Sequence, residues 1–248
     1  MDNNNFNWAH KPVYVPEQTG LVAKKFFANV FLWMFIALGL STLSAYFMAS
    51  TPALLQYLIK PEGGFTIFAY IAMFAPLGLV LLMSAGLSKL SYTALIGVFV
   101  LYSVLTGISL SFILLVYTSS SIMTCFAAAA GIFGIMAFLG YTTDVDLSKF
   151  GPILMVGVVG LVIASVVNMF IQSENFSLFM AFIGIAIFTA LTAYDVQKLK
   201  RIGAGLEESG AQIQDADTKK LAIMGALSLY LDFLNIFLFL LRIFGDRR

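Results

Sequence analysis

Cysteine and histidine are nearly absent from this sequence, and each absence excludes a class of chemistry. Among 248 residues there is one cysteine, Cys125, and one histidine, His10. A lone cysteine excludes a disulfide within the chain and a thiolate metal cluster. A lone histidine in a polar N-terminal stretch excludes a serine–histidine catalytic pair inside an apolar segment. The sequence also lacks the Gly-x-x-x-x-Gly-Lys pattern that cradles phosphates.

Charge is also scarce. Asp, Glu, Lys and Arg together make up 11% of the chain, whereas a soluble domain averages about a quarter. The formal net charge is +1, so the composition gives no indication of nucleic-acid binding. Hydrophobic residues make up 60% of the chain instead, and the mean hydropathy is +0.93. Several uncharged runs exceed the roughly 20 residues that cross the hydrocarbon of a bilayer as a helix, so we expect an integral membrane protein surrounded by lipid.

Seven membrane-spanning helices are predicted from these runs. The run from 90 to 143 is too long for one span, and it divides at the polar residues 117–121. The predicted fold class is therefore all-α, with spans near 26–49, 65–87, 92–116, 122–141, 151–171, 176–199 and 221–244. We expect a polar tail at 1–22, a single transmembrane domain at 23–248, and a loop at 202–220 between the last two spans.

Lysine and arginine are distributed unevenly over the two sides of the predicted bundle. Ten lie on the side of the N-terminus and four on the other. Because cytoplasmic loops carry an excess of these residues, we expect the N-terminus and the 202–220 loop in the cytoplasm and the C-terminus outside. The first 20 residues are polar and no small-residue cleavage site precedes the first span, so they are interpreted as a cytoplasmic tail rather than a signal peptide.

Two carboxylates fall inside the predicted spans. Of 13 acidic residues, only Asp195 and Asp232 do so, on the sixth and seventh helices. An ionised carboxylate at the centre of a bilayer costs about 2.5–3.5 kcal/mol on insertion scales, so such residues face the interior of a bundle and mark a functional site by default. Polar residues at helical spacing predict a shared interior around them: Ser228 and Asn235 beside Asp232, Thr192 beside Asp195, and Asn168 on the fifth helix.

Structural interpretations of the same residues stay open. Asp195 could pair with Lys198 three positions later, as a salt bridge at the membrane surface. Asp232 could be a buried structural group that is hydrogen-bonded by Asn235 and neighbouring hydroxyls. The serine and threonine side chains are more often contacts between helices than a pathway.

Five segments of the sequence resemble one known family. ALSLYLDFLN at 226–235, followed by LLRIFG at 240–245, closely resembles the last helix of the Bax inhibitor-1 family (transmembrane Bax inhibitor motif proteins). YDVQK at 194–198 is similar to the motif of that family's sixth helix, and DLSKFG at 146–151 is similar to the loop between its fourth and fifth helices. GISL at 107–110 is similar to part of its third helix. With its polar N-terminal tail, the chain is identified as a bacterial member, which implies the inner membrane.

The resemblance implies a fold and a function. Seven helices are expected, with the seventh packed centrally among the other six. The implied function is a pH-sensitive calcium leak governed by two aspartates that match Asp195 and Asp232, with no enzymatic activity and with calcium as the permeant or bound ion. In the family, a basic residue at the end of the second helix, usually arginine, bonds to this pair in the closed form; here Lys89 is the only candidate for that latch. Lysine lacks the bidentate fork of arginine.

The chemistry of such a pair can be stated independently of the family. Two carboxylates in one low-dielectric site cannot both ionise cheaply, so we expect Asp195 and Asp232 to share a proton and to titrate as a unit. Loss of the proton leaves two negative charges that repel unless a cation lies between them. Carboxylate oxygens are the ligands that Ca²⁺ prefers, so both aspartates are candidate calcium ligands.

Two other functions are alternatives. Intramembrane aspartyl proteases also carry an aspartate after a tyrosine on the sixth helix, which Tyr194 and Asp195 match, but their second aspartate follows Gly-x-Gly and Asp232 does not. A scaffold without transport, which modulates a membrane protease or a stress response through helix contacts, would conduct no ions at all.

Overall fold

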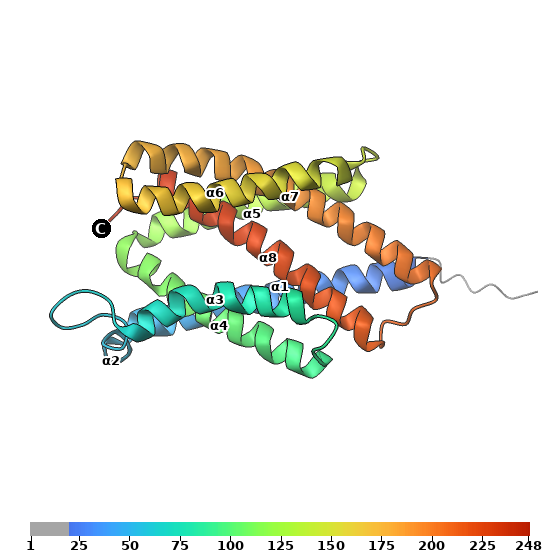
Figure 1. Ribbon diagram of the computed structural model, residues 1–248, viewed down its shortest axis with the longest axis horizontal. Helices are drawn as coiled ribbons and strands as arrows, with labels where there is room; N and C mark the ends of the chain where they lie inside the picture. Colours follow the sequence, from blue (N-terminus) through green and yellow to red (C-terminus); the bar gives the residue numbers. More distant parts are fainter. Residues whose placement is uncertain (1–19) are drawn as a thin grey trace, which may run out of the picture.

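The computed structural model describes residues 20–248 and is a bundle of helices (Figure 1). Within these residues seven helices are long and apolar enough to cross a membrane. They are α1 (Leu21–Ser50), α3 (Ile67–Gly86), α4 (Tyr92–Val116), α5 (Ser119–Thr142), α6 (Gly151–Ile171), α7 (Glu174–Glu208) and α8 (Ala216–Phe244). Two short helices complete the described chain, α2 (Pro52–Leu55) and the 3₁₀ turn η1 (Leu147–Phe150). The predicted all-α, seven-span membrane fold is confirmed.

Hydroxyl side chains cap the N-termini of several of these helices. The Thr118 hydroxyl accepts the backbone N–H of Ser121 at 3.4 Å, which caps α5 immediately after α4 ends at Val116. Ser91 and Ser173 cap α4 and α7 in the same way. Such caps satisfy backbone donors that a helix leaves unpaired at its N-terminus. The division predicted at 117–121 therefore coincides with the N-terminal cap of α5.

Helix α8 runs through the centre of the bundle. In Figure 1 it crosses diagonally between a group formed by α1, α3 and α4 and a group formed by α5, α6 and α7. It is the most buried of the seven spans, whereas α6 is the least buried and turns almost all of its apolar side chains outward. The prediction of a central last helix is confirmed. A helix that is buried on every side can carry a polar group that lipid would not tolerate.

Two glycines let helix backbones approach closely within these groups. A Cβ at Gly107 of α4 would lie 2.8 Å from the Cα of Ser41 on α1. A Cβ at Gly140 of α5 would lie 2.8 Å from the Cα of Ala193 on α7. Because lipid supplies no hydrophobic driving force between helices, such close packing is a main source of their association.

The loop expected at 202–220 is much shorter in the structure, and this expectation was wrong. Helix α7 continues to Glu208 and α8 begins at Ala216, so the joining segment is 209–215. The extension of α7 is held by α1: Gly203 packs on Ala23, and the Glu207 carboxylate accepts the backbone N–H groups of Gly20 and Ala23. Tertiary contact thus makes a charged, glycine-containing segment helical. Of the predicted tail at 1–22, residues 1–19 lie outside the described residues, and residues 21 and 22 already belong to α1.

The last residues of the chain are tied to the turn between α4 and α5. The backbone N–H of Thr118 donates to the carbonyl of Asp246 at 3.0 Å, and that of Arg248 donates to the carbonyl of Val116 at 2.9 Å. The Ser121 hydroxyl accepts the N–H of Asp246 at 3.0 Å. These bonds attach the end of the central helix to the end of α4 in one flanking group and to the start of α5 in the other.

Candidate functional site

Asp232 is the most unusual side chain of the central helix. Its side chain lies inside the bundle with the residue only 4% exposed, and its Oδ2 atom has no hydrogen-bond partner within the described chain. Buried polar atoms almost always have a partner, because an unpaired one costs about 1–3 kcal/mol. A buried carboxylate oxygen without a donor therefore calls for a functional explanation.

Asp195 lies on the neighbouring helix at a similar depth. It stands about 13 residues before the end of α7, and Asp232 stands about 16 residues after the start of α8, which correspond to roughly 20 Å and 24 Å of helix. The two antiparallel helices are joined by a short turn, so their depths differ by less than one helical turn. Asp195 is the charged group whose field acts on Asp232. The extension of α7 is what brings the two residues to the same level.

The two aspartates lie on adjacent helices at a similar depth, and no direct bond joins them among the described residues. Among the hydrogen bonds of the described residues none joins Asp195 to Asp232, so the shared proton stays a prediction. The two structural alternatives also lack their bonds here. Asp195 makes no salt bridge with Lys198, and the Asn235 amide donates at 2.8 Å to the carbonyl of Leu231 on its own helix.

The other predicted polar residues are placed differently from one another. Thr192 is fully buried on α7 and donates at 2.8 Å to the carbonyl of Phe188, and Ser228 is half-buried on α8. Asn168 does not join the pair: its Oδ1 atom accepts the N–H of Ser173 at 3.2 Å in the turn between α6 and α7, at the far end of α7 from the 209–215 turn. Its amide therefore hydrogen-bonds within that turn and does not take part in a polar interior shared with the aspartates.

Lys89, the candidate latch, is exposed in the turn between α3 and α4. No salt bridge or side-chain hydrogen bond of Lys89 is present among residues 20–248, so this structure does not bring it to either aspartate.

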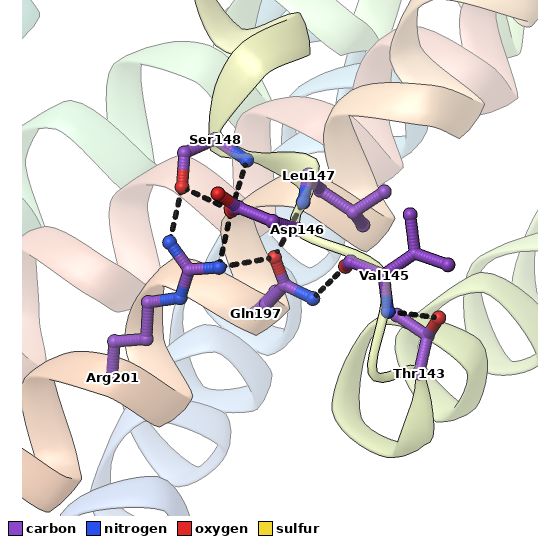
Figure 2. Close-up of polar contacts among 7 residues, drawn as sticks. All are labelled: Thr143, Val145, Asp146, Leu147, Ser148, Gln197 and Arg201. Atoms are coloured by element: carbon purple, nitrogen blue, oxygen red, sulfur yellow. Dashed lines mark hydrogen bonds and ion pairs between the residues drawn. The ribbon is translucent and has the colours of Figure 1, made fainter.

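A second polar cluster holds the loop between α5 and α6 on α7 (Figure 2), beginning at Gln197, two residues after Asp195. Gln197 is 6% exposed; its Oε1 atom accepts the N–H of Leu147 at 2.8 Å and its Nε2 atom donates to the carbonyl of Val145 at 2.8 Å. Arg201, one turn further along α7, donates to Asp146 at 2.5 Å and also to the hydroxyl of Ser148. We call Gln197, Arg201 and the residues that they bind, Val145–Ser148, the loop clamp.

The loop clamp fixes the charge state of Asp146. Hydrogen bonds from Ser148 and Arg201, with the positive charge of Arg201, hold the pKa of this carboxyl well below its ordinary value of 3.8. Asp146 is therefore ionised throughout the neutral range, so its ion pair with Arg201 does not titrate there. Any change of charge near neutral pH must come from other groups.

Sequence reasoning missed the roles of Gln197 and Arg201. The signal was present, since the two residues are four positions apart on one helical face and a carboxylate stands in the predicted 4–5 loop. The sequence does not show at which level of the sixth helix that loop packs.

Neither the loop clamp nor the aspartate pair has enough side-chain ligands to hold a metal ion by itself. Among residues 20–248, no group of three or more His, Cys, Asp or Glu side chains is arranged to hold a metal ion. Ca²⁺ takes six to eight oxygen ligands in its resident protein sites. Two carboxylates would therefore need water or carbonyl oxygens to complete the shell of a calcium ion.

Comparison with known proteins gives the same family over most of the chain. The family model described as "Inhibitor of apoptosis-promoting Bax1" matches residues 23–248. Inner membrane protein YbhL of Escherichia coli (strain K12) is 43% identical over 226 residues, which cover 90% of this chain and 92% of that protein. A protein of Borreliella burgdorferi is 39% identical over 233 residues, covering 94% and 96%, and one of Rickettsia prowazekii is 37% identical over 227 residues, covering 91% of each.

These matches cover all seven spans, including both aspartate-bearing helices. The chain, an integral membrane protein similar to bacterial inner membrane proteins, therefore belongs to the Bax inhibitor-1 family.

Proposed function

We propose that this protein is a pH-sensitive calcium-leak channel of the bacterial inner membrane, controlled by Asp195 and Asp232. The observation that carries the proposal is the unpaired Oδ2 atom of Asp232, which is buried in the central helix with a second carboxylate as its charged neighbour. A purely structural carboxylate would be hydrogen-bonded, because an unpaired one destabilises the fold.

The direction of the pH dependence follows from charge. At low pH the pair is protonated, attracts no cation and lets the central helix pack closely. As the pH rises, loss of protons leaves negative charge that repels itself and attracts calcium, so flux increases. With only two carboxylates, the pair binds a hydrated ion in passage and does not retain it.

The basic residues predict the orientation of the bundle in the membrane. The basic residues at the end of the bundle where α1 begins are Lys24, Lys25, Lys89, Lys149, Lys198, Lys200, Arg201, Lys219 and Lys220. Those at the other end are Lys60, Arg242, Arg247 and Arg248. By the positive-inside rule, the first group faces the cytoplasm, and the 209–215 turn that joins the two aspartate-bearing helices lies on the same side.

The test is calcium flux into proteoliposomes between pH 6 and 8. Wild-type protein is compared with Asp195→Asn and Asp232→Asn, and with Asp144→Asn as a matched control, since Asp144 is exposed in the loop before η1. We expect wild-type and control flux to rise with pH and the pH dependence to flatten in both pair variants. Flux that is flat with pH, or unchanged by both pair substitutions, contradicts the proposal.

Two further outcomes would replace the proposal by another function. Cleavage of a labelled transmembrane peptide that disappears in Asp195→Asn would make the protein an intramembrane aspartyl protease. A complete absence of flux from correctly folded protein would favour a scaffold.

A further inference from the structure

The polar stripe of α8 leads outward to an aromatic residue. From Asp232, one face of the helix continues to Asn235 and then to Phe239, at steps of three and four residues. On α7, the face that carries Asp195 continues in the same direction through Phe188 to Gly184, seven and eleven residues earlier. The two faces therefore define one seam between α7 and α8, which runs from the aspartate pair toward the C-terminal end of α8.

Phe239 fills this seam at Gly184. A Cβ at position 184 would lie 2.6 Å from the ring atoms Cδ2 and Cζ of Phe239, so the ring occupies the place where any other residue would carry a side chain. The ring of Phe188 lies beside it, with centroids 6.0 Å apart and an interplanar angle of 35°. A glycine at this position is thus used to seat an aromatic ring against a helix backbone.

Buried apolar side chains lie between the ring and the carboxylates. Leu191 on α7 is 5% exposed, and Ile236 on α8 is fully buried. Thr192, at the level of Asp232, is also fully buried, and its hydroxyl is satisfied within its own helix. At the level between the pair and Phe239, the polar side chains of the two helices are Asn235 on α8 and Thr189 on α7, whose buried hydroxyl has no partner within the described chain.

We propose that Phe239, seated on Gly184, is a hydrophobic plug that closes the α7–α8 seam between the aspartate pair and the outer face. Narrow hydrophobic constrictions stop ions by excluding water, and they open when a ring moves aside. The inference rests on the proposed function, because it assigns the barrier for the same ion path. Charging of the pair would drive α7 and α8 apart, and the ring would leave its seat.

Flux measurements test the plug with matched controls. Phe239→Ala should raise calcium flux at pH 6 severalfold over wild type, whereas Phe244→Ala, on the same helix and 64% exposed, should leave it unchanged. Gly184→Ala should also raise flux, because its methyl group displaces the ring, whereas Gly160→Ala meets nothing within 4 Å and should not. Equal flux in Phe239→Ala and Phe244→Ala overturns the plug. Each variant is first checked for a single folded species by size-exclusion chromatography.

A thiol-labelling experiment tests the plug without calcium transport. Cys125 is the only cysteine, so Cys125→Ala provides a background in which Thr192→Cys reports on water in the seam. A membrane-impermeant methanethiosulfonate reagent is added from the side of the C-terminal end of α8, with and without Phe239→Ala. We expect no modification with Phe239 present and rapid modification without it.

The outcomes distinguish the plug from the proposed function. Equal labelling rates with and without Phe239, whether fast or absent, overturn the plug even if the protein conducts calcium. Labelling that depends on Phe239 in a protein that conducts no calcium keeps the plug and removes the calcium leak.

Discussion

Single residues set the distances at which these helices pack. At Gly107 the backbones of α4 and α1 are so close that the Ser44 hydroxyl and the Ser41 backbone occupy the space of a side chain. The same helix carries Gly97, where a Cβ would meet nothing within 4 Å. The two glycines therefore have the same helical conformation and opposite surroundings.

Gly107→Ala should destabilise the protein, since the methyl group forces α1 and α4 apart. Overpacking of this kind costs typically about 1–3 kcal/mol. Gly97→Ala should be neutral or slightly stabilising, because alanine has the higher helix propensity. Thermal unfolding of both variants in detergent checks this, and equal transition temperatures would show that the α1–α4 crossing is not tight.

At the scale of elements, the loop clamp fixes the α5–α6 loop to the turn of α7 that follows Asp195. Gln197 is its buried member and makes two bonds to loop backbone, whereas the side chains of Arg201 and Asp146 are about half exposed. Exposed ion pairs contribute little to stability. Gln197 should therefore hold the loop more strongly than the ion pair does.

The clamp should be insensitive to pH in the range from 6 to 8 where the proposed function predicts a change in flux. The folded pKa of Asp146 lies below its ordinary value of 3.8, so its contribution is complete above that value and is lost only as the pH falls through the folded pKa. We expect the hydrogen-exchange protection of the Leu147 amide to stay constant from pH 8 to pH 5. Protection should fall strongly in Gln197→Leu, slightly in Asp146→Asn, and not in Asp144→Asn. Protection that falls between pH 8 and 6 would place a different titrating group in the clamp.

The sequence predicted some elements well and others poorly, for physical reasons. Hydropathy located the spans, and the run at 117–121 marked the α4–α5 division because hydroxyl groups there cap a helix. The 202–208 segment was expected to be loop because it is charged and contains glycine; it is helical because Gly203 and Glu207 contact α1, and such a contact is not encoded locally. Asn168 was misplaced because helical periodicity gives the face of a residue but not its depth.

At the scale of the whole molecule, the number of spans is odd, so the start of α1 and the end of α8 lie at opposite ends of the bundle (Figure 1). Lys60 is exposed in the loop before α3, and Lys89 is exposed in the turn after it, so the two lysines lie at opposite ends of the bundle. They therefore report the orientation of the entire bundle.

Single-cysteine labelling in the Cys125→Ala background should find Lys89→Cys accessible only from the cytoplasm and Lys60→Cys only from outside, in accordance with the positive-inside rule. Labelling of both from one side contradicts the seven-span bundle. Labelling with the two sides exchanged keeps the bundle and contradicts the assigned orientation.

The central position of α8 has a consequence for biogenesis. The ribosome makes this helix after the other six spans, so α1, α4, α5 and α7 enter the bilayer before the helix on which they all pack exists. Helices can insert individually and associate afterwards. Before the last span is made, the two flanking groups can contact each other mainly where α1 meets α7, and a nascent chain halted before residue 216 would be inserted without the helix that fills the centre of the bundle.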